Sequence, residues 1–151
     1  MASKRDMQSR DTFRPAAAQR LVEVRRRLLG ALHDAGAPIA LGSDAPQFFN
    51  VPGFSIHHEM RMMAAAGLTP YEVLATGTRA PARYFGTPEA FGTVAPGRRA
   101  DLILLDADPL DDLANVQRRV GVMVSGRWLP EDEIQARLRA IAEAVAEGDA
   151  G

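Results

Sequence analysis

One carboxylate lies where α/β enzymes commonly place reactive side chains. Asp44 follows a short apolar run, residues 39–41, and the two small residues Gly42 and Ser43. Barrels and open α/β sheets bind their ligands at the carboxyl ends of strands. A carboxylate there can bind a divalent cation and can exchange a proton with water or with a leaving group. Ser-Asp-x-Pro is also ordinary turn chemistry, so a purely structural role stays open for Asp44.

Two adjacent histidines form the second candidate. His57 and His58 fall near the start of an expected helix, where neighbouring positions point about 100° apart, so they cannot both bind one metal ion. We predict that His57 faces the pocket at the strand end and contacts substrate; a position on the helix surface is the alternative. His33 lies late in its helix, where a cation suits the helix dipole, and we expect a structural role.

Composition narrows the class of protein. The 151 residues contain no cysteine, which excludes disulfides and thiolate metal sites. The formal net charge of −1 predicts neither a nucleic-acid partner nor an anionic membrane partner. No apolar run reaches the roughly 18 residues that would cross a bilayer. The polar start of the chain does not resemble a secretory signal, so we predict a cytoplasmic protein.

The first half of the chain should form α/β units. Apolar residues recur at helical spacing over residues 16–35, which predicts one buried stripe: Leu21, Val24, Leu28 and Leu32. Gly36 and Pro38 end that helix. The continuous apolar run 39–41 then predicts a strand that is buried on both faces, as in a parallel sheet.

Helix-start signals follow the candidate site. Ser55 can cap a helix over residues 56–66, which Gly67 ends. Thr69-Pro70-Tyr71-Glu72 predicts a stronger start, with Thr69 as the cap, Pro70 at the first helical position and Glu72 closing a capping box. Another short helix is expected over residues 80–85.

The character of the sequence changes after Gly86. Strands are expected over residues 92–94 and 100–106. Residues 120–124 and 127–129 flank Ser125-Gly126, a two-residue spacing that predicts a β-hairpin. An amphipathic helix over residues 131–147 closes the chain.

We therefore predict an α/β protein in four parts. Residues 1–15 form a flexible leader, and residues 16–86 form the α/β part. Residues 87–130 form a small β-rich part, and residues 131–151 form the closing helix and tail.

The order of these segments resembles the amidohydrolase superfamily, especially its imidazolonepropionase-like and prolidase-like branch. The resemblance spans about residues 20–130. The matching stretches occur along this chain in the same order as in the family. The matching stretches are residues 31–38 leading into 41–45, residues 53–60, 65–70 and 76–82, then the extended match over 92–106, and finally 108–110 and 124–127.

This resemblance implies part of a (β/α)₈ TIM barrel, including its eighth strand, followed by part of a small β-sandwich. Residues 16–86 would be the barrel portion and residues 87–130 the sandwich portion. Asp44 would be the aspartate after strand eight, which binds the metal and shuttles a proton. The implied reaction is metal-dependent hydrolysis of amide-like C–N bonds in a small-molecule or peptide substrate, with Zn²⁺ as the expected ion.

The sequence also departs from the family pattern. The family's His-x-His pair, its bridging carboxylated lysine or glutamate and its further histidines would lie upstream of the matched stretch. One aspartate supplies one ligand, whereas catalytic zinc takes three protein ligands and water. We therefore expect metal binding and activity only with a complete barrel, supplied by the missing N-terminal portion. A non-catalytic module that associates through exposed strand edges, with itself or with a partner, is the alternative.

Overall fold

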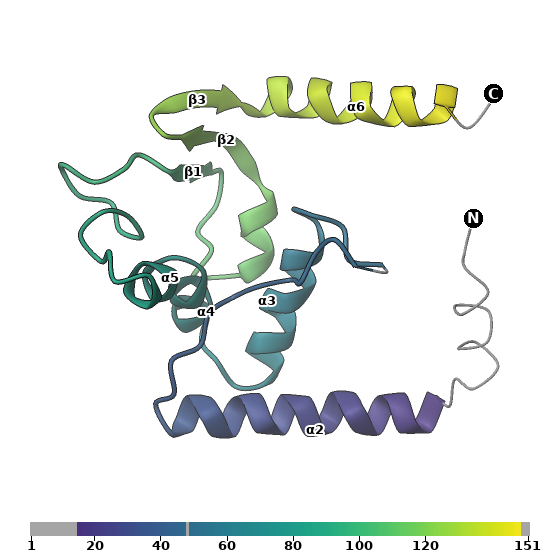
Figure 1. Cartoon of the computed structure of the whole chain (residues 1–151), viewed down its shortest axis with the longest axis vertical. Helices are drawn as coiled ribbons and strands as arrows, with labels where there is room; N and C mark the ends of the chain where they lie inside the picture. Colours follow the sequence, from purple (N-terminus) through teal and green to yellow (C-terminus); the bar gives the residue numbers. More distant parts are fainter. Residues whose placement is uncertain (1–14, 48, 149–151) are drawn as a thin grey trace.

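The computed structural model describes residues 15–47 and 49–148 (Figure 1). Along this part of the chain the elements are α2 (Pro15–Asp34), α3 (Ser55–Ala65), α4 (Pro70–Gly77), α5 (Arg79–Tyr84), β1 (Leu102–Leu105), the 3₁₀ helix η1 (Leu113–Gln117), β2 (Arg119–Val124), β3 (Arg127–Pro130) and α6 (Glu131–Gly148). Helices α2 and α6 run along opposite sides of the molecule, with the shorter helices and the sheet between them (Figure 1). The proposed leader, apart from Pro15, lies outside the described residues.

Helix α2 forms where the sequence predicts it, but its apolar stripe is not buried. The stripe residues Leu21, Val24, Leu28 and Leu32 expose between 43% and 57% of their surface. Helix α2 packs on α3 through a different face, at Gly30, where an added Cβ would lie 2.8 Å from the carbonyl oxygen of Ala66. The prediction of a buried stripe is therefore wrong, because nothing in the described residues covers that face.

The capping box at α4 is confirmed. Thr69 Oγ1 accepts a hydrogen bond from the Glu72 amide at 3.3 Å, and Glu72 Oε2 accepts one from the Thr69 amide at 2.8 Å. The predicted cap at Ser55 is wrong, because Phe54 is the N-cap residue of α3 and makes no side-chain cap bond. Ser55 Oγ instead accepts a hydrogen bond from the Val51 amide at 2.8 Å.

A small core joins α3 and α4. Its buried side chains are Met60, Met63, Leu68 and Val73, against which Ile39 and Leu41 pack from one side. The buried Thr76 hydroxyl donates a hydrogen bond to the Val73 carbonyl at 2.6 Å, so this polar group is satisfied inside the helix. Met60 and Met63 thus supply the α3 side of this core.

The run 39–41 is not a β-strand in this structure, which corrects the prediction of a strand buried on both faces. Ile39 and Leu41 are half-buried, and Ala40 is exposed. Among the described residues, the only backbone–backbone hydrogen bond of the run joins the Leu41 amide to the Thr76 carbonyl at 3.0 Å. A strand needs a neighbouring strand to complete its ladder, and no such neighbour lies beside residues 39–41 among the described residues.

The β-rich part is an antiparallel sheet with the strand order β1-β2-β3. The predicted hairpin is confirmed: Val124 pairs with Arg127 around Ser125 and Gly126, whose φ angles are 49° and 82°. Two positive φ angles suit the twist of a two-residue hairpin turn. The strands expected within 100–106 and 120–129 form, as does the closing helix, but residues 92–94 form no strand.

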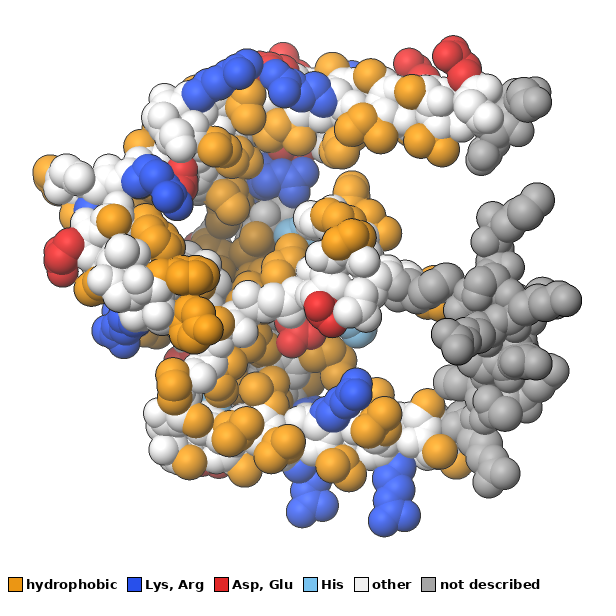
Figure 2. All heavy atoms as spheres, viewed as in Figure 1, with side chains coloured by type: hydrophobic (Ala, Val, Ile, Leu, Met, Phe, Trp, Pro, Cys, Tyr) orange, Lys and Arg blue, Asp and Glu red, His pale blue; other side chains and the backbone are white. Residues whose placement is uncertain are grey.

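The chain exposes more surface than a compact protein of its size. Its accessible surface is 11464 Å². A compact monomer of 16.3 kDa exposes about 7,500 Å². Hydrophobic side chains are visible over both α2 and α6 (Figure 2). Within the described residues, no helix combines the length and the apolar character that a membrane span requires.

Candidate functional site

Asp44 lies in an exposed loop directly after the core-packed run 39–41. Its φ angle of 54° places it in the left-handed region, which aspartate tolerates better than most residues. Its carboxylate accepts a hydrogen bond from Gln47 Nε2 at 2.6 Å through Oδ2. A bridge between Gln47 and Asn50 closes the same loop. The carboxylate is thus held at the surface, and it does not line any of the three cavities described below.

His57 lies in a cavity of about 310 Å³ between α3, α4, η1 and the sheet. Leu41, Met60, Ile103 and Arg119 are among the residues that line it. Burial lowers the pKa of His57 below its ordinary value of 6.5, and the positive charges of Arg119 and Arg61 lower it further. A neutral imidazole at pH 7 can both donate and accept a hydrogen bond, as a substrate-binding group would require.

Arg119 connects this cavity to the C-terminal helix. Its Nε and Nη2 atoms lie 3.2 and 3.1 Å from the two carboxylate oxygens of Glu131, the first residue of α6. Gln135 Nε2 also donates to Glu131 Oε1 at 2.7 Å. The hydrogen bond from Gln135, followed by the contacts with Arg119, holds the pKa of Glu131 below its ordinary value.

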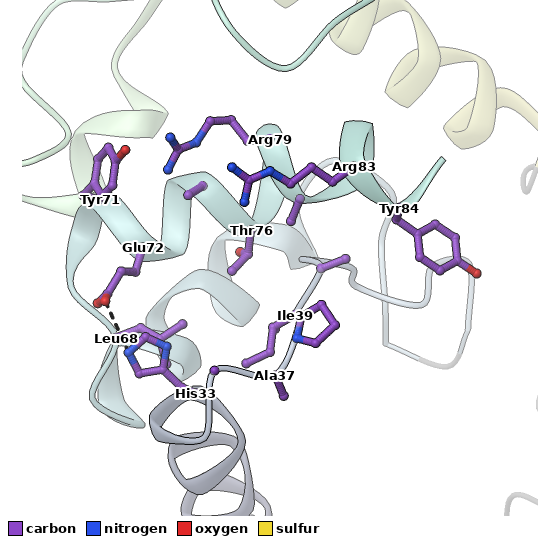
Figure 3. A pocket seen from close by; sticks show the side chains of 15 residues that line it. His33, Ala37, Ile39, Leu68, Tyr71, Glu72, Thr76, Arg79, Arg83 and Tyr84 are labelled. Carbon is purple, nitrogen blue, oxygen red and sulfur yellow. Dashed lines mark ion pairs between the residues drawn. The ribbon is translucent and has the colours of Figure 1, made fainter. Parts of the chain in front are cut away.

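A larger groove of about 690 Å³ lies on the other side of the run 39–41, between the end of α2, α4 and α5. In Figure 3, Ala37 and Ile39 lie on one side of this groove, and Arg79 and Arg83 project from α5 on the opposite side. His33 Nε2 lies 3.3 Å from Glu72 Oε1 at the edge of the groove (Figure 3). This contact joins the last turn of α2 to the first turn of α4. A smaller cavity, of about 240 Å³, lies between α5 and the loop around Glu89.

The described residues do not form a metal site by themselves. They contain no group of three or more His, Asp or Glu side chains placed to share one ion. Asp44 offers one carboxylate, whereas a catalytic zinc takes three protein ligands. The metal-binding role of Asp44 therefore stays a prediction that depends on ligands from elsewhere.

The sequence did not reveal Arg119 as a neighbour of His57. Arg119 lies at the start of β2, where the register of the β1–β2 pairing shifts, so simple alternation along the strand does not give the direction of its side chain. No signal in the sequence shows that Arg119 and His57 line the same cavity, because the two residues lie far apart in the chain.

The chain belongs to the amidohydrolase family, whose sequence pattern matches residues 2–129. It is 40% identical over 93 residues to the imidazolonepropionase of Paracoccus denitrificans strain Pd 1222, a match that covers 61% of this chain and 23% of the relative. It is 35% identical over 112 residues to the imidazolonepropionase of Salmonella agona strain SL483, covering 72% and 26%.

The fold is similar to that of solved structures in the same family. The chain superposes on the crystal structure of a candidate prolidase from Bifidobacterium longum with a TM-score of 0.62 and 32% sequence identity, covering 67% of this chain and 25% of that one. The resemblance to imidazolonepropionase-like and prolidase-like proteins is thus confirmed. The chain spans about a quarter of the length of these relatives.

Proposed function

We propose that this chain is the C-terminal portion of a metal-dependent amidohydrolase that hydrolyses C–N bonds. Family membership supports hydrolysis as the general reaction. The observation that carries the proposal is the position of Asp44, exposed in the loop that follows the core-packed run 39–41. Within the described residues, the carboxylate accepts one hydrogen bond, from Gln47 to Oδ2. Oδ1 accepts none there and is therefore open to a ligand from elsewhere.

In this proposal Asp44 has two roles. It contributes one ligand to a divalent metal, with Zn²⁺ as the expected ion, whose remaining ligands come from the other part of the barrel. It also takes a proton from the attacking water and returns it to the leaving amine. His57, kept neutral by burial and by the nearby arginines, binds a polar group of a small-molecule or peptide amide.

This division of ligands predicts that the chain alone neither holds zinc tightly nor turns over an amide. Elemental analysis of the purified chain tests the first statement directly. Zinc bound in a one-to-one ratio, and retained through dialysis against a weak chelator, would contradict the proposal that most ligands lie elsewhere.

Complementation tests the second statement. The full chain is co-expressed with the part of the Paracoccus imidazolonepropionase that precedes the matched stretch, and hydrolysis of that relative's own substrate is measured. We expect activity from the pair and from neither piece alone. Asp44→Asn should abolish this activity, whereas Asp111→Asn, at another exposed loop carboxylate, should preserve it. An active Asp44→Asn pair would remove Asp44 from the catalytic machinery.

A further inference from the structure

The hydrogen bond between Gln47 and Asp44 does not close an ordinary turn. Gln47 Nε2 donates to Asp44 Oδ2 at 2.6 Å, and both side chains are exposed. An aspartate that closes a turn accepts from the backbone amide two residues further on. Here that residue is Pro46, which has no amide hydrogen. Within the described residues, the carboxylate is therefore held by a side chain rather than by the backbone of its own turn.

Gln47 is itself connected to the start of α3. The Asn50 amide donates to the Gln47 carbonyl at 2.9 Å, and an antiparallel bridge joins the same two residues. The next residue, Val51, donates its amide to Ser55 Oγ at 2.8 Å, and its carbonyl accepts from the Ser55 amide at 3.0 Å. Ser55 is the first residue of α3, the helix that supplies two methionines to the core. The loop that carries the donor is thus held against a packed helix.

An exposed hydrogen bond of this kind adds little to the stability of a fold, because water competes for both groups. It does restrict the carboxylate. A carboxylate offers about four lone-pair sites on two oxygens, and a fixed donor on one oxygen limits the orientations that the group can take. Hydrogen-bonding partners of metal-binding carboxylates act in this way, and their loss typically lowers metal affinity or activity by about 10–100-fold.

We propose that Gln47 is a positioning residue for Asp44. Its side-chain amide holds Oδ2 and so leaves Oδ1 as the oxygen that contributes to the metal site. The Ser55 hydroxyl, through Val51, keeps the loop that carries this donor in place. The inference rests on the proposed function for the role of Asp44, whereas the hydrogen bond between the two side chains is a property of this chain alone.

NMR of the full chain tests the hydrogen bond without zinc and without catalysis. In Asp44→Ala the Gln47 side-chain amide loses its acceptor, so the resonance of its bonded proton should move upfield and exchange faster with water. Gln117, an exposed glutamine on η1, is the reference whose side-chain amide resonances should stay in place. Unchanged Gln47 resonances in Asp44→Ala would show that the bond is absent in solution. That result overturns the inference and leaves the proposed function intact.

The chain complemented with the upstream part of the Paracoccus relative tests the role of the bond. Gln47→Met keeps the length of the side chain but removes the donor. We expect this variant to lower kcat by about 10–100-fold with KM little changed, and to weaken zinc retention against a chelator by a similar factor. Gln47→Lys restores an N–H donor and should recover most of both losses. Gln117→Met is the matched control and should leave kcat and zinc retention unchanged.

The unfolding midpoint separates a positioning role from a structural one. It should be the same for Gln47→Met and for the unsubstituted chain, because the bond is exposed. A lower midpoint that accounts for the lost activity, or full activity and zinc retention in Gln47→Met, overturns the inference and leaves the proposed function intact. A complemented pair that is inactive with the unsubstituted chain contradicts the proposed function, and the role given to Gln47 falls with it.

Discussion

Arg119 on β2 and Glu131 at the start of α6 form a two-point ion pair, with N–O distances of 3.2 and 3.1 Å. The two side chains are about three-quarters buried, at 24% and 27% exposure. This pair connects the sheet to the helix that packs on it. Arg119 also lines the cavity of His57. The same guanidinium therefore pairs with Glu131 of α6 and lowers the pKa of His57 on α3.

Glu131→Gln should lower the free energy of unfolding at pH 7 by about 0.5–1 kcal/mol, the range of a partly exposed ion pair. Since the folded-state pKa of Glu131 lies below its ordinary value, its contribution is present above about pH 4.5 and is lost as the pH falls through the folded-state value. Thermal unfolding between pH 3 and pH 7 measures this effect. Glu147→Gln, at an exposed position on the same helix, is the control and should show no such loss.

His57 should titrate below pH 6.5 in the folded chain, and its protonation should destabilise the fold. Because the unfolded state binds the proton more readily, this contribution to stability is complete above pH 6.5 and falls as the pH drops toward the folded-state pKa. Two-dimensional NMR of the imidazole resonances gives the pKa. Arg119→Gln should raise it by removing a positive charge, although burial should still hold it below 6.5. A folded-state pKa at or above 6.5 would contradict the burial of this side chain beside two arginines.

Met63→Ala should cost about 2–5 kcal/mol, because it removes one of the largest fully buried side chains and leaves a cavity. The core around it is small, so this loss is a large part of the total stability of a domain. Urea denaturation followed by circular dichroism provides the measurement. Met62→Ala changes the same residue type one position earlier, where the side chain is only half-buried, and should cost clearly less. Equal losses for the two variants would contradict the described core.

Gly121→Ala should destabilise the sheet by about 1–3 kcal/mol through steric overlap. An added Cβ would lie 2.6 Å from Cη2 of Trp128 and 2.8 Å from the carbonyl oxygen of Leu129. The indole covers Gly121 across the hairpin, so Trp128 fluorescence reports the change directly. Gly148→Ala is the matched control, because a Cβ there would contact nothing within 4 Å. An unchanged unfolding midpoint for Gly121→Ala would show that the indole moves aside without cost.

Local signals in the sequence predicted several elements well. The capping box of Thr69 and Glu72 and the two-residue turn at Ser125-Gly126 depend on residues within four positions of each other. Such signals act between residues close in the sequence, so they can be recognised without knowledge of the tertiary structure. The resemblance to the amidohydrolases was also detectable in the order of the motifs, and the family match confirms it.

The sequence by itself thus determined the family, most of the helices and the hairpin. The tertiary structure decided which apolar surfaces are covered: residues 39–41 form no strand, and the stripe from Leu21 to Leu32 is exposed. It also decided that Arg119 and His57 share a cavity. An apolar pattern indicates that a surface favours burial, but burial needs a partner surface. That partner comes from distant parts of the chain or from another polypeptide, so local sequence cannot specify it.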